Sequence, residues 1–375
     1  MMDVVVVGAS PAGLVAAKEC AKKDVDVKIL EKRQSFEDYR LPDTSFYGFF
    51  DFLGFDVSDD YVRHELDGME IISPLDSRVK INERGFSFNR EKFSYHYLDK
   101  ARDEGVEIEF GAEVTDLGDN KVEVDGGRDV EAEVIIFAGG SNSDLLRRID
   151  IETMKYPGDL AKAIQADVKN VDVDEDYFHY FLGRDIAPGW KISINPKGGD
   201  VFSVGAFVVG YSPKKYFDKF LDGEIFDEAE VINVQRGEDQ IITIPNDLVL
   251  NNVCFVGGAA GQAGIPFSMK AGEMCGNIVG KAVREEKVGE EFLLNYEKKW
   301  KSNFNKYYKL ARFSLLNIKK MSDEDLDRAV KSLENTNISE IMDEHDNKLL
   351  IGLIIALKMF KNDPGIISLA KYLFK

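Results

Sequence analysis

The sequence predicts an α/β protein in which a Rossmann-type nucleotide-binding domain is interrupted by an inserted antiparallel-sheet domain and followed by a helical C-terminal region. Three observations lead to this prediction. Residues 1–32 have the pattern of strand, glycine turn, helix and strand. From about residue 156 to 245 the pattern changes to successive alternating strands, and from residue 290 onward it is nearly all helical.

The first turn carries the most specific signal. Val4–Val7 form an apolar, β-branched run, as expected for a strand buried on both faces. Gly8, Ser10 and Gly13 then occupy the three positions of a dinucleotide-binding turn, and Glu31 follows the second strand, where a carboxylate can bond a ribose hydroxyl. Free N–H groups at the helix N-terminus would hold a pyrophosphate. The alternative is a buried βαβ unit without ligand.

Composition excludes several functions. The chain has 67 acidic and 48 basic residues, a net charge of −19, which argues against nucleic acid as a partner. Its three cysteines form no CxxC motif and its four histidines lack ligand spacing, so we expect a reduced cytoplasmic setting and no metal site. The longest apolar stretch, LLIGLIIALKMF, is shorter than the roughly 20 residues that span a bilayer.

Two later glycine turns resemble the first. Ala138–Gly140 and Gly257–Gly261 each follow a buried strand and precede a helix, and a further helix begins at Arg90. We expect all of these to converge on one ligand. Three turns are more than a small nucleotide needs, and they suit an extended ligand such as FAD.

These patterns define the expected domains. The FAD-binding domain is discontinuous, the substrate domain is inserted into it, and a helical region ends the chain. The expected ranges are 1–60, 84–150 and 250–288 for FAD, 61–83 and 151–249 for substrate, and 289–375 for the helical region.

The motifs resemble those of the FAD-dependent geranylgeranyl reductases, including the archaeal enzymes that saturate the isoprenoid chains of ether lipids. The resemblance covers roughly residues 1–285. It implies an FAD cofactor and a reaction that reduces C=C bonds of geranylgeranyl-type chains. The segments that carry it are GASPAG with EKR, FNREKF, VIIFAGGSNSDLLRR, PGWKISINPKGGDVFSVGAFV and VCFVGGAAGQAGIPFSMKAG.

The resemblance also implies which residues contact the cofactor. Gly8 and Glu31 would hold the ADP half, and Gly264 would lie near the isoalloxazine ring. The full implied set is Gly8, Ser10, Pro11, Ala12, Gly13, Glu31, Lys32, Arg40, Arg90, Val114, Ala138, Gly139, Gly257, Gly258, Gly261, Gly264 and Ile265.

The chain departs from the family pattern at four places. Gly139 and Gly258 stand where the family has aspartates, and each loss removes a charge-assisted hydrogen bond of about 1.5–3 kcal/mol. Arg40–Thr44 replaces a stretch that places a cysteine near the flavin. Lys191–Pro196 replaces an aromatic Tyr-x-Trp-x-Phe-Pro stretch, with Trp190 one place early. These changes indicate a divergent member with a reshaped substrate pocket.

Flavin chemistry asks little of side chains, because reduced flavin supplies hydride and the protein mainly positions the substrate and excludes water. A proton donor is still needed. Tyr39, Asp43 and Tyr47 are the candidates, since they lie in the segment that should face the flavin. A structural role is the alternative for each.

The substrate residues expected are aromatic. Phe46 and Tyr47 begin a dense aromatic run that could form one wall of a long apolar tunnel. The opposite wall could come from Tyr177, Phe178, Tyr180, Phe181, Phe202 and Phe207, and Trp190 is a further expected substrate residue. Ordinary core packing is the alternative for both walls.

Partners follow from the same resemblance. We expect an isoprenoid lipid substrate, while the absence of a second nucleotide motif leaves the electron donor open. The lysine-flanked apolar stretch Lys348–Lys375 indicates peripheral contact with the inner face of the membrane, or else a helix docked on the protein itself. Two other functions stay open: a flavin monooxygenase or dehydrogenase acting on another apolar substrate, and a non-catalytic flavin-fold protein that binds lipid.

Overall fold

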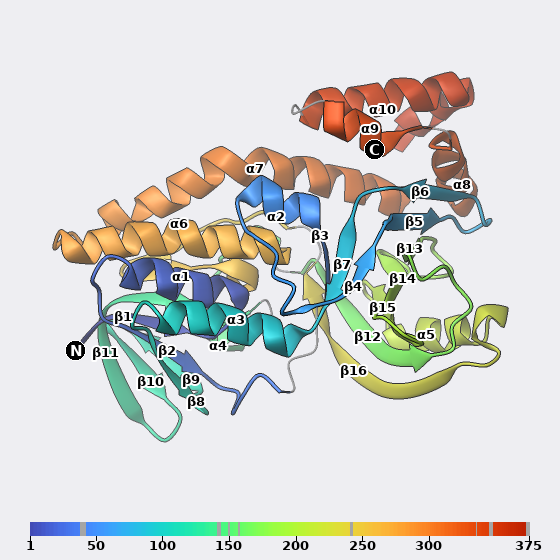
Figure 1. Cartoon of the computed structure of the whole chain (residues 1–375). Helices are drawn as coiled ribbons and strands as arrows, with labels where there is room; N and C mark the ends of the chain where they lie inside the picture. The colour runs from blue at the N-terminus through green and yellow to red at the C-terminus, as the bar shows by residue number, and fades with distance from the viewer. Residues whose placement is uncertain are drawn as a thin grey trace.

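The computed structural model describes residues 1–37, 43–140, 144–148, 151–156, 158–240, 243–334, 336–344 and 348–372. The chain forms two lobes that lie side by side (Figure 1). Helix α7 (Glu290–Lys320) runs over both lobes, and the last helices lie above the second lobe, at the top right of the view. The predicted combination of an α/β domain, an inserted sheet and a helical C-terminal region is confirmed.

The first lobe is built on a mostly parallel sheet in the order β17-β18-β11-β1-β2-β8. Its central strand is the predicted first strand, whose residues Val4, Val5 and Val6 are fully buried. The sheet strands and the two strands that extend β11 are β1 (Met2–Val7), β2 (Val27–Glu31), β8 (Glu107–Phe110), β9 (Val114–Gly118), β10 (Lys121–Val124), β11 (Arg128–Phe137), β17 (Val249–Leu250) and β18 (Val253–Phe255).

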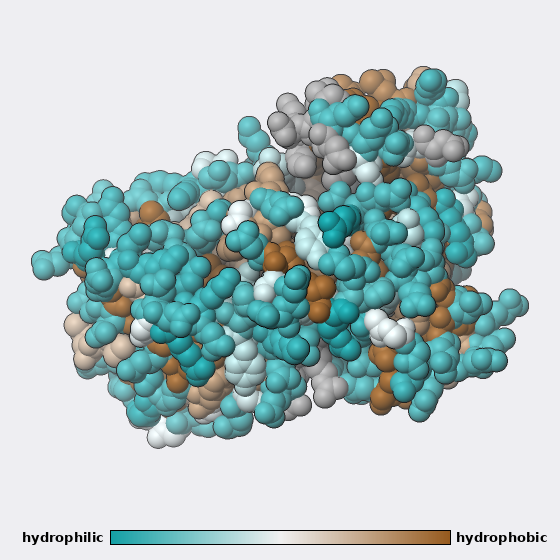
Figure 2. Space-filling view, in the orientation of Figure 1, coloured by the Kyte–Doolittle hydropathy of each residue, from teal (hydrophilic) through white to brown (hydrophobic). Residues whose placement is uncertain are grey.

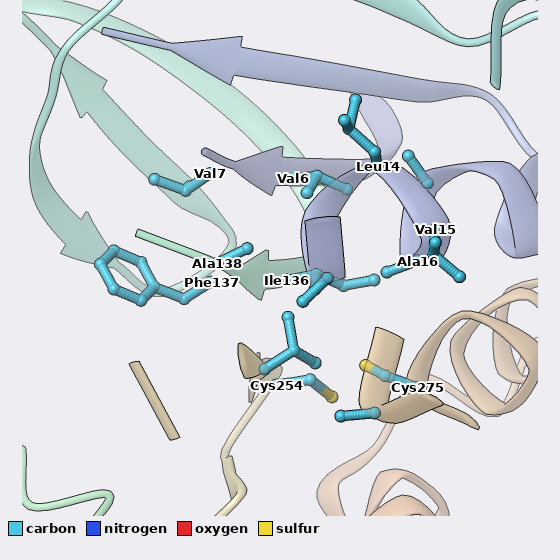
Figure 3. Packing of buried hydrophobic residues seen from close by; sticks show 14 of the residues in the cluster. Val6, Val7, Leu14, Val15, Ala16, Ile136, Phe137, Ala138, Cys254 and Cys275 are labelled. Carbon is cyan, nitrogen blue, oxygen red and sulfur yellow. The ribbon is translucent and has the colours of Figure 1, made fainter. Parts of the chain in front are cut away.

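Helices α1 (Pro11–Ala21) and α6 (Ile265–Arg284) pack on this sheet and on each other (Figure 1). A Cβ added to Gly272 or Gly276 of α6 would lie 2.2 or 2.3 Å from the carbonyl oxygens of Ala12 and Ala16 in α1. The two helices therefore touch backbone to backbone. Figure 3 shows the core between them and the sheet, where Cys254 and Cys275 lie among valine, isoleucine and alanine side chains.

The second lobe is a seven-stranded sheet in the order β16-β12-β15-β14-β13-β5-β6. One face packs on helix α5 (Pro213–Leu221) and the short helix η1 (Glu224–Phe226) through buried residues such as Ile164, Ile194 and Val204. The strands are β5 (Gly68–Ile72), β6 (Arg78–Ile81), β12 (Leu160–Lys169), β13 (Tyr177–Phe181), β14 (Lys191–Pro196), β15 (Val201–Val208) and β16 (Glu230–Gln240).

A small sheet of β3 (Thr44–Phe46), β7 (Gly85–Phe88) and β4 (Val62–Leu66) lies between the lobes. Residues 44–53, at the start of the aromatic run, form β3 and helix α2 (Tyr47–Leu53). Aromatic residues occur on both faces of α2, so no helical period shows in the sequence: Phe50 is buried, whereas Phe49 and Phe52 are about half exposed, at 47% and 49%.

The remaining elements follow the predicted order. Helix α3 (Arg90–Arg102) begins at the residue expected and is capped by Asn89, whose side chain accepts from the backbone N–H of Lys92. The other short elements are α4 (Asp144–Arg148), η2 (Gly257–Ala260), α8 (Asp323–Ser332), α9 (Ile338–Glu344), α10 (Lys348–Asn362) and η3 (Pro364–Tyr372). None of the helices in the described residues is long and apolar enough to cross a membrane.

A buried ion pair joins β5 to β13, two strands that are far apart in the sequence. His179 is 2% exposed; its Nδ1 lies 3.0 Å from Glu70 Oε2 and its Nε2 lies 2.7 Å from the carbonyl oxygen of Asp174. The ring is therefore held between a carboxylate on one strand and a backbone carbonyl oxygen on the other side. The hydrogen bond from His179 lowers the pKa of Glu70 below its ordinary value.

The replacement Glu70→Ala is expected to lower the free energy of unfolding by about 1–3 kcal/mol, because it leaves the buried His179 ring without one of its hydrogen-bond partners. A carboxyl pKa lowered by folding stabilises the protein above the ordinary glutamate pKa, and this stabilisation is lost as pH falls through the lowered value. The difference between the two proteins in urea unfolding should therefore shrink in acid. Asp129→Ala, which removes an exposed partner of Lys121, is the control and should have little effect. Equal losses in both variants would contradict the assignment.

Candidate functional site: a dinucleotide cradle facing a polar sheet

The three glycine turns lie next to one another at one edge of the first sheet. Strands β1, β11 and β18 are parallel neighbours, with Val7 beside Phe137 and Phe137 beside Phe255. The carboxyl ends of parallel strands meet at one edge, which is where open α/β sheets bind ligands. We call the three turns, residues 8–13, 138–140 and 257–264, the cradle.

Two glycines of the first turn serve the packing of the cradle itself. Gly8 has a φ of +97°, and a Cβ there would lie 2.8 Å from the carbonyl oxygen of Ala138. A Cβ on Gly13 would lie 2.2 Å from the carbonyl oxygen of Gly8. Any side chain at Gly13 would therefore push α1 off the strand before it met a ligand.

Ser10, the departure from the usual middle glycine, is the N-cap of α1. Its Oγ accepts from the backbone N–H of Gly13 at 3.3 Å, and Pro11 begins the helix with its φ already fixed. Ser10 thus stabilises the start of α1, the helix that begins in the first glycine turn.

Glu31, at the end of β2, is hydrogen-bonded to the backbone of the first glycine turn. Its carboxylate is 2% exposed; Oε2 accepts from the backbone N–H of Ala9 at 2.7 Å and Oε1 from that of Arg33 at 2.9 Å. The guanidinium of Arg33 also donates to Oε1 at 3.2 Å. A carboxylate has about four acceptor sites, so about one remains for a ribose hydroxyl. The neighbouring side chain of Lys32 is exposed.

The third turn is held by a buried glutamine that sequence reasoning missed. Gln262 is fully buried; its Oε1 accepts from the backbone N–H of Gly257 at 2.8 Å, and its Nε2 donates to the Tyr296 hydroxyl at 2.8 Å. Tyr296 in turn donates to the carbonyl oxygen of Phe255 at 2.9 Å, and Tyr308 donates to that of Ala263 at 3.0 Å. The feature of the sequence that could have predicted this role is the position of Gln262, an amide side chain inside a glycine-rich turn.

The cradle fits an extended dinucleotide. A Cβ on Gly140 would meet no heavy atom of the described residues within 4 Å, and one on Gly264, before Ile265, would meet only the ring of Phe267 at 3.5 Å. The backbone is thus open on one side while α1 and α6 point their N-termini toward it. Arg90 is 3% exposed at the start of α3 and adds a buried cation.

Two other residues of the implied cofactor set have less informative positions. Val114 is buried in β9, and Gly258 lies within the short helix η2, beside Gly257 and before Gly261. Arg40 lies outside the described residues.

The second sheet presents a polar face opposite its α5-covered face. Tyr180, Ser193, Gly205 and Gln165 form one row across β13, β14, β15 and β12. Asn195, Ser203 and Asp167 form the next row, and Lys191 and Phe207 form the row on the other side. We call this surface the inner face. Gln165, Ser193, Asn195 and Ser203 are each at most 8% exposed, so a set of hydrogen-bonding groups is buried here.

An ion cluster ties the inner face to the start of β3. Lys197, 7% exposed, places its Nζ 2.8 Å from Asp167 Oδ1 and 3.2 Å from Asp43 Oδ2. Burial raises the pKa of the Asp43 carboxyl, and the neighbouring Lys197 ammonium opposes that rise. Of the two candidate proton donors that the structure describes, Asp43 is buried and Tyr47 is partly exposed.

Aromatic rings connect the inner face to the N-terminus of α6. The ring of Phe178 lies 5.2 Å from that of Phe46, Phe46 lies 6.1 Å from Phe49, and Phe49 lies 6.0 Å from Phe267. Phe267 then packs edge-on against Tyr308. This aromatic path places Phe46, one of the expected substrate residues, between the sheet and the cradle.

The structure does not bring the other expected substrate residues to that path. Phe181 was expected in the tunnel wall, but it lies on the opposite face of the sheet, where its ring packs 4.8 Å from Phe220 of α5. The alternation of β13 explains this, because Tyr180 takes the inner face and its neighbour cannot. Trp190 packs between the sheet and Leu315 of α7.

Tyr47 is likewise engaged elsewhere. Its hydroxyl donates to Glu65 Oε1 at 2.5 Å, and burial together with this carboxylate raises its pKa above the ordinary value. Its ring packs on Phe86. Tyr39 lies outside the described residues.

The three cysteines are buried in the core and form no disulfide. Cys20, Cys254 and Cys275 are all buried and free, and burial raises the pKa of the Cys20 and Cys275 thiols. Cys20 and Cys275 are therefore poor nucleophiles. No group of three or more potential metal ligands occurs in the part of the chain that the structure describes.

Two family models match the sequence. Residues 6–46 match an NAD(P)-binding Rossmann-like domain, which confirms the dinucleotide-binding pattern of the first turn. Residues 159–238 match the geranylgeranyl reductase catalytic domain, and these residues supply β12 to β16 with the inner face.

Similar sequences cover the whole chain. The digeranylgeranylglycerophospholipid reductase 2 of Methanococcoides burtonii is 28% identical, over 100% of this chain and 96% of the relative. The digeranylgeranylglycerophospholipid reductase of Methanothrix thermoacetophila is 29% identical, over 90% of this chain and 93% of the relative.

Solved structures show the same fold. A geranylgeranyl bacteriochlorophyll reductase-like protein from Thermoplasma acidophilum superposes with a TM-score of 0.83 at 22% identity and covers 99% of both chains. The halogenase PltM has a TM-score of 0.71 at 15% identity, covering 98% of this chain and 85% of its own. The resemblance of this chain to the geranylgeranyl reductase family, indicated by its motifs, is confirmed along its whole length.

Proposed function

We propose that this chain is an FAD-dependent oxidoreductase that reduces C=C bonds in the isoprenoid chains of lipids. The observation that carries the proposal is the combination of the cradle with a second sheet that matches the geranylgeranyl reductase catalytic domain. Relatives that align over nearly the whole chain are named as digeranylgeranylglycerophospholipid reductases, which supports the same substrate class here.

Each part of the site has a role in this reaction. Reduced FAD held in the cradle would supply the hydride for a C=C bond. The turns held by Glu31 and Gln262 orient the cofactor through backbone N–H groups. The aromatic path places apolar rings beside the cradle, where the isoprenoid chain would lie. Burial raises the pKa of the Asp43 carboxyl, which favours its protonated form and makes it the candidate proton donor.

Reduction can be tested directly. The flavin-loaded protein, reduced with dithionite under anaerobic conditions, should add hydrogen pairs to geranylgeranyl lipids, which mass spectrometry detects as gains of two hydrogens per saturated bond. The oxidised protein without dithionite is the control. A flavin-loaded protein that leaves every isoprenoid unreduced, with an unchanged flavin spectrum, would exclude this function. Lipid-dependent oxygen consumption would instead favour a monooxygenase.

The glycine at position 258 predicts a gain-of-affinity variant. Because Gly258 stands where the family has an aspartate and lies within η2, Gly258→Asp should restore one charge-assisted hydrogen bond to FAD. Such a bond of about 1.5 kcal/mol corresponds to roughly tenfold tighter binding, measurable by titrating apoprotein with FAD. Gly289→Asp, which adds the same charge at the start of α7, should leave FAD affinity unchanged. Weaker FAD binding by Gly258→Asp would show that this turn does not face the cofactor as proposed.

The C-terminal helices support peripheral contact with a membrane as part of the same proposal. They dock on the protein through Arg328 with Asp363 and Lys371 with Asp325, so the tail is anchored to α8. Apolar side chains nevertheless stay exposed at the top of the view (Figure 2). They are Leu353 at 56%, Leu357 at 59%, Phe360 at 46% and Ile367 at 69%.

Replacing these four exposed residues with serine should abolish flotation of the protein with liposomes of anionic phospholipid, because their burial in the interface provides the binding energy. Val231, Ile232 and Val234, exposed on edge strand β16, are the control; their replacement with serine should leave flotation unchanged. Flotation that survives the four C-terminal replacements, or no flotation of the parent protein, would remove membrane contact from the proposal.

A further inference from the structure

We infer that Lys191, on the inner face of the second sheet, binds the phosphate group of the lipid substrate. The inference rests on the proposed function, which supplies the isoprenoid lipid, and it names the part of the headgroup that the site recognises. It assigns to this chain a preference for an isoprenoid lipid that carries a phosphate over the same lipid with a free alcohol.

The first support is that Lys191 is a cation without an anionic partner. Its side chain is partly exposed, and within the residues that the structure describes its ammonium group has no ion pair and no hydrogen bond. The Nζ atom lies instead 3.7 Å from the centre of the Tyr180 ring and 5.7 Å from that of the Phe207 ring. Aromatic rings attract an ammonium group without neutralising its charge. The positive charge therefore stays available to an anion.

The other lysine of the inner face shows the contrast. Lys197 is buried, and its Nζ lies 2.8 Å from Asp167 Oδ1 and 3.2 Å from Asp43 Oδ2. Both carboxyl groups are thus bound at the far end of β14. The row of Asp167 is two rows away from that of Lys191. These carboxyl groups do not cancel the charge of Lys191.

The second support is the charge on α7, the helix that packs against the same end of the sheet. A Cβ on Gly189, two residues before Lys191, would lie 3.4 Å from Cε of Lys319. A second basic side chain therefore lies beside the start of β14. Asp323, at the start of α8, accepts from the backbone N–H of Arg184 at 3.0 Å. Two ammonium groups near one end of the inner face favour an anion there.

The third support is the position of Lys191 relative to the aromatic path. The antiparallel pairing of β13 with β14 puts Phe178 in the row of Asn195, and Phe178 packs against Phe46. Lys191 lies four residues before Asn195, which is about 13 Å along a strand. A lipid can therefore place its phosphate at Lys191 while its chain follows the aromatic path toward the cradle.

The test compares two lipids that differ only in the headgroup, digeranylgeranylglyceryl phosphate and digeranylgeranylglycerol. Binding to the FAD-loaded protein is read from the change that each lipid causes in the flavin absorbance spectrum. The parent protein should bind the phosphate about tenfold more tightly, because its contact with Lys191 is a charge-assisted hydrogen bond. Added salt should reduce this preference, since it screens a partly exposed charge.

Three variants separate recognition from folding and from net charge. Lys191→Met removes the ammonium group and should weaken binding of the phosphate about tenfold, with binding of the alcohol unchanged. Lys191→Arg keeps a cation and should keep the preference. Lys162→Met makes the same loss of charge at an exposed lysine of β12 that shares its face with Ile164, away from the inner face, and should behave as the parent protein. FAD content and thermal unfolding confirm that each variant is folded.

Steady-state reduction with dithionite adds a second readout. Lys191→Met should raise KM for the phosphate and leave kcat unchanged, because Lys191 binds the headgroup and takes no part in the transfer of hydride or proton. A fall in kcat with KM unchanged would overturn the inference.

The remaining outcomes distinguish the inference from the proposed function. A parent protein that reduces isoprenoid chains but binds both lipids equally overturns the inference and leaves the function standing, as does a preference that survives in Lys191→Met. Inorganic phosphate that displaces the phospholipid at equal concentration would assign Lys191 to free phosphate and also overturn it. A parent protein whose flavin responds to neither lipid, and which reduces neither, overturns both.

Discussion

The close packing of α1 on α6 is the contact on which the rest of the structure depends. Glycines at 272 and 276 let the α6 backbone approach the carbonyl oxygens of Ala12 and Ala16, and any larger side chain would separate the helices. The two helices come from opposite ends of a discontinuous domain. Because α6 carries the last glycine turn at its N-terminus and α1 carries the first, their contact sets the spacing of the cradle. The second lobe can be inserted between them without disturbing it.

The conformation of the glycine turns does not depend on side chains at positions 139 and 258. The turns are fixed from behind, by Glu31 bonding the backbone of Ala9 and by Gln262 bonding that of Gly257. Neither bond requires the aspartates that the family has at positions 139 and 258. A cofactor held mainly by backbone N–H groups and helix N-termini loses affinity when those aspartates go, but the groups that orient it remain.

The sequence predicted the cradle well because its signals are local. A β-branched run, a glycine turn and a small-residue helix each follow from a few neighbouring residues, and the structure places all three turns as expected. Three features could not be predicted in this way. Helix α2 has aromatic residues on both faces and shows no period. Phe181 lies on the α5 face because of a strand register that only the folded sheet reveals. The Lys197 cluster joins residues 43, 167 and 197, whose proximity is a property of the tertiary fold.

The same departures from the family pattern therefore have different physical meanings in the two lobes. In the first lobe, glycine replaces aspartate in turns that other residues already hold, so the change adjusts binding strength. In the second lobe, Lys191, Ser193 and Asn195 replace aromatic residues on alternate positions of β14, and alternation puts all three on the inner face. An apolar ligand binds less favourably to a face of buried amide and hydroxyl groups than to a face of aromatic rings. The reason is that the polar atoms of the first face stay without hydrogen-bond partners under an apolar ligand. The three glycine turns thus keep their arrangement, while β14 presents polar side chains on a face where the family resemblance implies aromatic ones.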